Sequence, residues 1–304
     1  MFNKNDTVCF FGASIITHGH AMKEVFQYVV DNHKEDRVKF LNCGVPGDAA
    51  CRSLHRLYED LLIHNPNKII IMIGHNDIER ALYVPGNEIE NREEKKKYYL
   101  ELYKKSVREV VERCTAFGAE MILCTLTPVE AAKSPCNGAC NEALAICNEF
   151  IRELAKEKNL KLVDFNSIMS GMLDKEIMSK DGVHPTELGH HIMAQILLKE
   201  LGYIKEMDLE TMPVFSAKNE ERFETEQIYR SIKMVEWTTL YDFMIENPDA
   251  SYSEKIELIK EKRQDSVNVG MGWFMDATDN YLKYSHKITK LQEKLLKETI
   301  EMYE

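Results

Sequence analysis

The sequence predicts an α/β protein built on a parallel β-sheet, and three observations support this fold class. Short apolar runs alternate with amphipathic helical patterns over roughly the first two thirds of the chain. These runs are continuously apolar rather than alternating, which is typical of strands covered on both faces. Strands and helices that alternate in this way form a parallel sheet with right-handed crossovers and helices on both faces.

The expected elements follow one another in a regular order. Strands are predicted at 7–12, 38–43, 68–74, 120–127 and 161–165. Helices are predicted at 20–34, 51–63, 92–117, 141–158 and 186–201. The last of these helices ends in KELG, where Lys199 suits the final turn and Gly202 suits the position just beyond the helix.

The character of the chain changes after Tyr203. Residues 1–203 carry the α/β pattern, whereas 204–304 carry no convincing strand and form an all-helical C-terminal extension. Helices are expected there at 219–246, 252–264 and 270–302.

An apolar repeat with spacings of three and four residues runs along the last expected helix and predicts a face that packs against another helix. The repeat consists of Phe274, Ala277, Tyr281, Tyr284, Ile288, Leu291 and Leu295. Packing within the chain is the default interpretation. A homodimer through this face, and a lid over the mouth of a site in the first region, stay open.

Composition and charge argue against several classes of partner. The 39 Lys and Arg residues against 50 Asp and Glu residues give a formal charge of −11, which disfavours nucleic acid and anionic membranes. No apolar run approaches the roughly 18 residues of a membrane span, and the N-terminus lacks the apolar core of a signal peptide. The eight cysteines include no C-x-x-C motif, so neither a zinc ribbon nor a thioredoxin-type motif is indicated. Five of them lie in apolar or helical runs, as buried free thiols do, and together with the missing signal peptide this favours a cytoplasmic location.

Four chemically distinctive segments follow predicted strands. Gly12-Ala13-Ser14 follows the first strand, NCGVPGDAA (42–50) the second and GHND (74–77) the third. DGVHP (181–185) comes after the fifth strand and just before the last helix of the α/β region. Because ligands bind at the carboxyl ends of parallel strands, these segments are expected to lie together at one edge of the sheet.

The residue types in these segments suit nucleophilic catalysis. A serine such as Ser14 needs a base to take its proton and a carboxylate to orient that base, and His184 and Asp181 offer both from one loop. A developing oxyanion needs preorganised donors. The candidate donors are the backbone N–H groups of Ser14 and Gly47 and the side-chain amide of Asn76.

These four segments, in this order, resemble the SGNH hydrolase superfamily of GDSL-type esterases and lipases. FFGASI matches its nucleophile block, NCGVPGDA its glycine block, IGHND its asparagine block and DGVHP its Asp-x-x-His block, over about residues 5–203. The resemblance implies a flavodoxin-like three-layer α/β/α sandwich with sheet order 2-1-3-4-5, and neither a metal nor an organic cofactor. It also implies that Ser14 is the nucleophile, His184 the base and Asp181 its orienter, with Ser14, Gly47 and Asn76 forming the oxyanion hole.

One residue departs from the family pattern. Ala13 stands where the nucleophile block usually has an aspartate, so a hydrogen-bonding carboxylate beside the nucleophile is missing. The four block-defining residues are all present. A neighbouring class, the α/β-hydrolases, is disfavoured because the segment 12–16 lacks the second glycine of G-x-S-x-G.

The predicted function is that of a serine esterase or acylhydrolase that works through an acyl-enzyme. A short acyl group, such as acetyl, on a sugar or another polar alcohol is the favoured small-molecule substrate. Two alternatives stay open, namely a lysophospholipase or thioesterase type of acylhydrolase, and a catalytically degenerate domain that binds a ligand or serves in assembly.

Several histidines lie near these segments. His18 and His75 are weaker candidates for contact with substrate. His190 and His191 are expected on the last helix of the α/β region, one facing solvent and the other facing the sheet. The pairs His18/His20 and His190/His191 resemble metal ligands, but no Asp, Glu or Cys lies at a spacing that would complete a site with either pair, so no metal is predicted.

Overall fold

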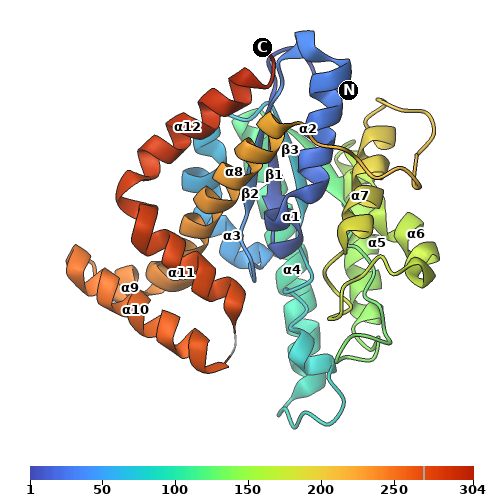
Figure 1. The fold of residues 1–304 in the computed structure, drawn as a ribbon. Coiled ribbons are helices and arrows are strands. Elements are labelled where there is room, and N and C mark those ends of the chain that lie inside the picture. The colour runs from blue at the N-terminus through green and yellow to red at the C-terminus, as the bar shows by residue number, and fades with distance from the viewer. Residues whose placement is uncertain (270) are drawn as a thin grey trace. The chain divides into compact units, whose positions relative to one another are not determined.

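The computed structural model of the chain describes residues 1–269 and 271–304 and divides them into two compact units (Figure 1). The first unit is Met1–Phe215 and the second is Ser216–Glu304. The first unit therefore includes residues 204–215, which the sequence pattern groups with the helical extension. The N–H of Asp208 donates to Gln195 and its carbonyl accepts from His191, and these contacts join that segment to the α/β region.

The first unit is built on five parallel strands in the order β2-β1-β3-β4-β5. This result confirms both the predicted fold class and the strand order. The strands are β1 (Thr7–Gly12), β2 (Lys39–Gly44), β3 (Lys68–Met72), β4 (Glu120–Cys124) and β5 (Lys161–Val163). Gly12 is in register with Gly44 on one side and Met72 on the other, so the carboxyl ends of three strands meet at one edge.

Helices surround this sheet (Figure 1). They are α1 (Ser14–His18), α2 (His20–Asn32), α3 (Ala50–Arg56), α4 (Arg92–Phe117), α5 (Asn141–Glu157), α6 (Phe165–Met169) and α7 (Glu187–Glu200). Helix α2 packs against α7, whereas α3 packs against α4 and α4 against α5. Right-handed crossovers place these two groups on opposite faces of the sheet, which gives the predicted three layers.

Some predicted boundaries differ from the observed ones. The helix expected at 51–63 ends at Arg56 and continues as a π turn, Leu57–Leu61, and a 3-10 turn, Leu62–His64. The strand expected at 120–127 stops at Cys124. The Thr125 N–H still donates to the Val163 carbonyl of β5 at 3.0 Å, but the N–H of Leu126 leaves the ladder and donates to the Asn148 side chain at 2.7 Å. Shorter 3-10 turns cover Lys34–Asp36, Arg80–Tyr83 and Ser170–Lys175.

The second unit is helical in all its described elements. They are α8 (Ala217–Val235), a π turn (Glu236–Leu240), α9 (Tyr241–Glu246), α10 (Tyr252–Val269), α11 (Gly272–Tyr284), a 3-10 turn (Ser285–Lys287) and α12 (Ile288–Glu301). The single helix expected at 270–302 is thus two helices. Its expected first residue, 270, lies outside the described residues.

The apolar repeat of the last helices packs within this unit. Ala277 and Tyr281 belong to a buried cluster with Ile232 and Val235 of α8, and the side chains of four other repeat members pack against that cluster. Those four are Phe274, Tyr284, Ile288 and Leu291. The unit's own helices therefore occupy much of this face, while a homodimer and a lid role both stay predictions.

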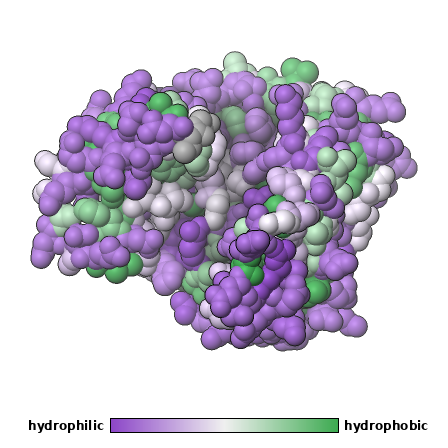
Figure 2. All heavy atoms as spheres, turned by 90° about the horizontal axis from the view of Figure 1, so that it is seen from below, coloured by the Kyte–Doolittle hydropathy of each residue, from purple (hydrophilic) through white to green (hydrophobic). Residues whose placement is uncertain are grey.

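The surface of the molecule is largely polar on the face drawn in Figure 2, as expected for a chain with 29% charged residues. Apolar residues appear there as scattered patches. Among the described helices, none combines the length and the apolar character that a membrane crossing requires.

Candidate active site

Ser14 lies where β1 ends and the chain turns into α1. Gly12 is the last residue of β1, and a Cβ at this position would lie 2.1 Å from the carbonyl oxygen of Met72 in β3. Only glycine permits this close approach of two strand ends. Ser14 then opens α1, and Thr17 steadies the turn by donating its hydroxyl to the Ala13 carbonyl at 3.0 Å.

Asp181 and His184 lie in the loop that precedes α7. The Asp181 Oδ1 atom accepts hydrogen bonds from the Ser179 hydroxyl and the Val183 N–H at 2.8 Å each, and from the His184 N–H at 3.0 Å. Gly182 allows the tight turn, since its φ is +72° and a Cβ would clash with the backbone of Glu130. The carboxylate is therefore fixed by its own loop.

The structure brings three of the predicted site residues into one hydrogen-bonded chain. The His184 Nδ1 atom lies 2.5 Å from Asp181 Oδ2, and the His184 Nε2 atom lies 2.8 Å from Ser14 Oγ. Partial burial raises the pKa of Asp181, but the hydrogen bonds from His184, Val183 and Ser179 outweigh burial and hold that pKa well below its usual range. An ionised Asp181 accepts from Nδ1–H, so the lone pair of Nε2 faces the serine hydroxyl.

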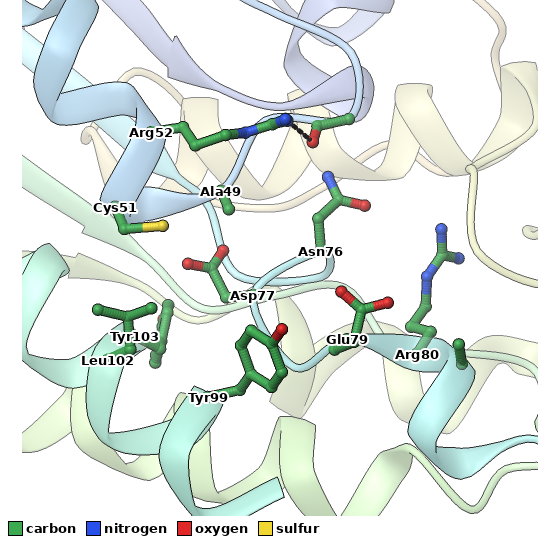
Figure 3. A pocket seen from close by; sticks show the side chains of 12 residues that line it. Ala49, Cys51, Arg52, Asn76, Asp77, Glu79, Arg80, Tyr99, Leu102 and Tyr103 are labelled. Carbon is green, nitrogen blue, oxygen red and sulfur yellow. Dashed lines mark hydrogen bonds between the residues drawn. The ribbon is translucent and has the colours of Figure 1, made fainter. Parts of the chain in front are cut away.

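Gly47 and Asn76 line one cavity of about 510 Å³ (Figure 3). Gly47 has a φ of +72°, and no atom lies within 4 Å of where its Cβ would be. The Asn76 side chain donates to the Asp48 carbonyl at 2.8 Å, which fixes the orientation of its amide. The loop that contains Gly47 is tied to the end of β1 through the Val45 N–H, which donates to the Gly12 carbonyl at 3.0 Å.

The lining of this cavity is mainly polar. Arg52, Glu79, Arg80 and Tyr99 line it together with Asn76, and Figure 3 shows the side chains of Glu79 and Tyr99 close to each other below Asn76. Sequence reasoning missed these residues. Glu79 and Arg80 lie two and three residues after GHND and were within reach of such reasoning, whereas Tyr99 on α4 carries no local signal.

Asp77, next to Asn76, is buried at the edge of this cavity. Its Oδ1 atom accepts from the Ala50 N–H at 2.7 Å, and its Oδ2 atom has no hydrogen-bond partner within the described structure. Burial raises the pKa of Asp77 to about 7. Asp77 thus supports the start of α3 through one oxygen.

The two weaker candidates have different surroundings. The His18 ring lies 5.2 Å from the His184 ring, centroid to centroid, so it borders the serine–histidine pair. His75 is buried, and its Nε2 atom lies 2.9 Å from the Thr127 carbonyl oxygen. Burial lowers the pKa of His75 to about 4. Contact of His18 or His75 with substrate stays a prediction.

His190 and His191 are both buried on α7, so the prediction that one of them faces solvent is wrong. His191 is held by Glu24, whose carboxylate lies 2.8 Å from Nδ1, and by the Asp208 carbonyl, 2.9 Å from Nε2. Among the residues that the structure describes, no three His, Cys, Asp or Glu side chains are placed to hold a metal ion.

Comparison with known proteins agrees with this architecture. The fold and the four matched segments define an SGNH-type ester hydrolase. The chain belongs to the family described as GDSL-like Lipase/Acylhydrolase, which matches residues 8–197, and it is a hydrolase of ester bonds. The resemblance inferred from the sequence is thereby confirmed.

Two curated relatives are acetylxylan esterases. The one from Geobacillus stearothermophilus is 26% identical over 170 residues, which cover 55% of this chain and 73% of the relative. The one from Xylanibacter ruminicola is 28% identical over 148 residues, which cover 46% of this chain and 29% of the relative.

Two solved structures show the likeness of the fold. A gut microbial diltiazem-metabolizing enzyme has a TM-score of 0.81 at 16% identity, covering 100% of this chain and 95% of that one. The acetylxylan esterase Axe2 of Geobacillus stearothermophilus has a TM-score of 0.56 at 23% identity, covering 66% of this chain and 96% of that one. The first likeness extends over the helical unit as well as the α/β unit.

Proposed function

We propose that this chain is a serine esterase that removes a short acyl group, such as acetyl, from a sugar or another polar alcohol. The observation that carries the proposal is the chain of hydrogen bonds from Ser14 Oγ through His184 to Asp181. The acetylxylan esterase relatives support an acetylated carbohydrate as the substrate class.

In the proposed reaction, Ser14 Oγ attacks the ester carbonyl while Nε2 of His184 takes the hydroxyl proton. Asp181 keeps Nδ1 protonated and stabilises the imidazolium that forms. His184 then gives its proton to the leaving alcohol, which leaves the acyl group on Ser14. Water, deprotonated by His184, attacks this acyl-enzyme and releases the acid.

The oxyanion of each tetrahedral intermediate is held, in this proposal, by the N–H groups of Ser14 and Gly47 and by the Asn76 amide. These donors are neutral, so they stabilise the developing charge without pairing to a competing anion. Loss of one such donor typically lowers kcat by about 10²- to 10³-fold.

The polar cavity beside Gly47 and Asn76 is proposed to hold the alcohol part of the substrate. Its volume of about 510 Å³ suits a small polar ligand such as one or a few sugar units. The hydroxyl groups of a sugar can pair with Arg80, Glu79 and Tyr99. An apolar alcohol of similar size would offer these polar side chains no hydrogen bonds, so the lining favours a polar alcohol.

Acetate release from acetylated xylo-oligosaccharides, measured beside p-nitrophenyl acetate and p-nitrophenyl octanoate, tests this proposal. We expect turnover of both acetyl esters, little turnover of the octanoyl ester and none with Ser14→Ala. Arg80→Gln is expected to raise KM for the acetylated sugar and to leave KM for p-nitrophenyl acetate unchanged. Faster turnover of the octanoyl ester would contradict the assignment of a short acyl group.

A further inference from the structure

We propose that Arg56 and Asp48 form a positioning pair that sets the distance between the nucleophile strand and the donors of the oxyanion hole. This inference rests on the proposed function. Neither residue is one of the predicted site residues, and neither is placed to touch the reacting atoms. Their role would be exerted through Gly12, Gly47 and Asn76.

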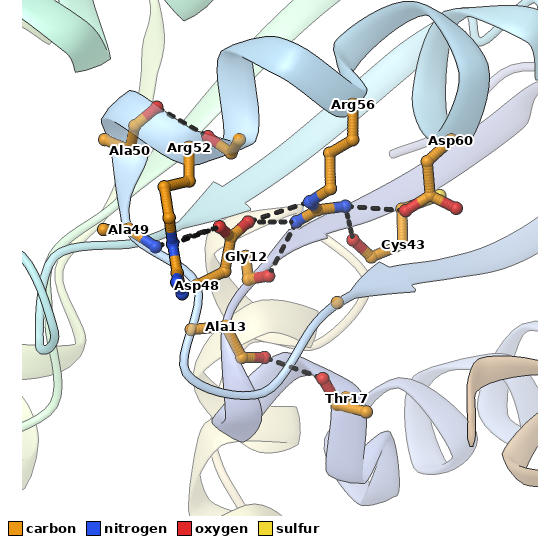
Figure 4. A network of polar contacts seen from close by, with 12 residues as sticks. Gly12, Ala13, Thr17, Cys43, Asp48, Ala49, Ala50, Arg52, Arg56 and Asp60 are labelled. Atoms are coloured by element: carbon orange, nitrogen blue, oxygen red, sulfur yellow. Dashed lines mark hydrogen bonds and ion pairs between the residues drawn. The ribbon is translucent and has the colours of Figure 1, made fainter. Parts of the chain in front are cut away.

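Arg56 lies on α3 with only 1% of its surface exposed, and its guanidinium is fully engaged (Figure 4). Its Nε and Nη2 atoms each lie 2.8 Å from Asp48 Oδ2, which makes a fork on one carboxylate oxygen. Its Nη1 atom donates to Asp60 Oδ2 at 2.7 Å. The face of the guanidinium lies over the Phe11 ring, 4.3 Å from the centroid.

The same guanidinium holds the ends of two strands. Nη2 donates to the carbonyl of Gly12, the last residue of β1, at 3.1 Å. Nη1 donates to the Cys43 carbonyl near the end of β2 at 2.8 Å. Gly12 comes two residues before Ser14, so Arg56 fixes the strand end from which the nucleophile projects.

Asp48 connects Arg56 to the two other predicted donors of the oxyanion hole, Gly47 and Asn76. It directly follows Gly47, and its backbone carbonyl accepts the hydrogen bond from the Asn76 side chain at 2.8 Å. Its Oδ1 atom also accepts from the Ala49 N–H at 3.0 Å. One ion pair therefore connects the segment before Ser14 with both other predicted donors.

Physical chemistry favours a positioning role over stability alone. A buried ion pair stabilises a fold little, and well-packed apolar residues often serve stability better. A guanidinium, however, has five donors in a rigid fork and can hold carbonyls and carboxylates at fixed separations. Burial raises the pKa of Asp48, and the adjacent charge of Arg56 and its hydrogen bond oppose this shift.

The pair also bears on the unusual nucleophile segment. Ala13 offers no side-chain hydrogen bond next to Ser14, so support must reach this turn through the backbone. The Arg56 bond to the Gly12 carbonyl supplies it from α3.

Asp48→Asn, compared with Asp60→Asn, tests the inference. Both variants keep the side-chain shape and remove one carboxylate from the same buried guanidinium, but only Asp48 adjoins Gly47 and holds Asn76. We expect Asp48→Asn to lower kcat for p-nitrophenyl acetate by about 10- to 100-fold while KM changes by less than about threefold, as loss of donor placement predicts. Asp60→Asn should lower the melting temperature to a similar extent and keep kcat within about threefold.

A double variant separates positioning from instability. If Asp48 acts through Asn76, the combination of Asp48→Asn with Asn76→Ala should lower kcat little more than Asn76→Ala alone. If Asp48→Asn does not fold, Arg56→Lys takes its place in the comparison with Asp60→Asn. Arg56→Lys keeps the positive charge but removes the paired N–H donors of the guanidinium. Equal losses of kcat in the two carboxylate variants, or strictly additive effects in the double variant, would overturn the inference.

The rate of phosphonylation by a fluorophosphonate keeps this test distinct from that of the proposed function. If the wild-type chain neither reacts with the reagent nor turns over esters, the proposed function fails. If the wild-type chain reacts and Asp48→Asn reacts as fast as Asp60→Asn, the serine esterase proposal stands and the positioning pair fails.

Discussion

Two histidine–carboxylate pairs in the α/β unit have nearly the same contact but very different surroundings. His184 Nδ1 lies 2.5 Å from Asp181, and His191 Nδ1 lies 2.8 Å from Glu24. The side chains of the first pair are 26% and 49% exposed, against 2% and 7% for the second. Only the first pair is reachable by a substrate.

The second nitrogen of each ring separates the two pairs further. Nε2 of His184 faces the Ser14 hydroxyl, from which it can take a proton. Nε2 of His191 faces the Asp208 carbonyl, which only accepts, so this nitrogen must carry a hydrogen and donate it. A carboxylate next to one ring nitrogen therefore does not by itself make a histidine a base. The hydrogen-bond partner of the other ring nitrogen determines whether the ring can accept a proton.

The carboxylates also differ in their pKa. Hydrogen bonds to Asp181 overcome the effect of its partial burial and lower its pKa. Burial raises the pKa of Glu24, opposed by hydrogen bonds from Gln195 and His191. Asp181 thus stays ionised, whereas the surroundings of Glu24 favour its protonated form more than water does.

The largest expected effect comes from replacing the two histidines in parallel. His184→Gln should lower kcat by about 10⁴-fold or more, because the serine loses its base. His191→Gln should keep kcat near the wild-type value and lower the melting temperature, because it disturbs a buried hydrogen-bond network. Steady-state kinetics and thermal melts of both variants test this difference. A similar loss of kcat in both variants would contradict the distinction between the two pairs.

The carboxylates give the next effect. Asp181→Asn should lower kcat by about 10³- to 10⁴-fold while leaving the fold intact, because an amide no longer fixes the protonated state of Nδ1. Its matched partner, Glu24→Gln, should leave kcat nearly unchanged. Kinetics over a range of pH check both variants, and full activity of Asp181→Asn would remove Asp181 from the proposed mechanism.

A smaller loss of kcat is expected when a predicted donor of the oxyanion hole is removed. Asn76→Ala should lower kcat by about 10²- to 10³-fold with little change in KM, since the donor acts mainly in the transition state. Asn87→Ala serves as the control, because the Asn87 amide donates to the Ala81 carbonyl on the exposed surface. A rise in KM at constant kcat would instead make Asn76 a substrate-binding residue.

The smallest expected effect concerns stability and pH. The folded-state pKa of Asp77 is raised to about 7, above its ordinary value of 3.8. The folded protein therefore binds this proton more tightly than the unfolded chain, so the contribution of Asp77 to stability is lost as the pH rises from about 4 to about 7. Melting temperatures between pH 4.5 and 7.5 should decline less steeply for Asp77→Asn than for the wild type, and identical slopes would contradict the buried, protonated carboxyl.

Most of the α/β unit could be predicted from the sequence because its signals are local. Continuous apolar runs marked the strands, and the resemblance supplied their order. The exact strand ends could not be predicted, because Leu126 leaves the ladder for the side chain of Asn148, a residue on a later helix. The break at Ser285–Lys287 likewise carries no glycine or proline that would mark it.

In the candidate site, too, the sequence predicts residues that stand in short recognisable segments and misses those whose contacts form only on folding. Ser14, Asp181 and His184 stand in short segments of recognisable composition, and the structure joins them by hydrogen bonds. Arg56 has no such segment. Its partners Gly12, Cys43 and Asp48 come together only when two strand ends, a loop and a helix pack, so no local pattern reveals the network.

The central claim is that Ser14 is an activated nucleophile, and covalent labelling tests it most directly. Wild-type protein and Ser14→Ala would be treated with a fluorophosphonate, and their intact masses would be measured. We predict one adduct on the wild type and none on the variant. An unlabelled wild type, or equal labelling of both proteins, would contradict the claim and leave the Ser14–His184–Asp181 chain of hydrogen bonds as a structural feature only.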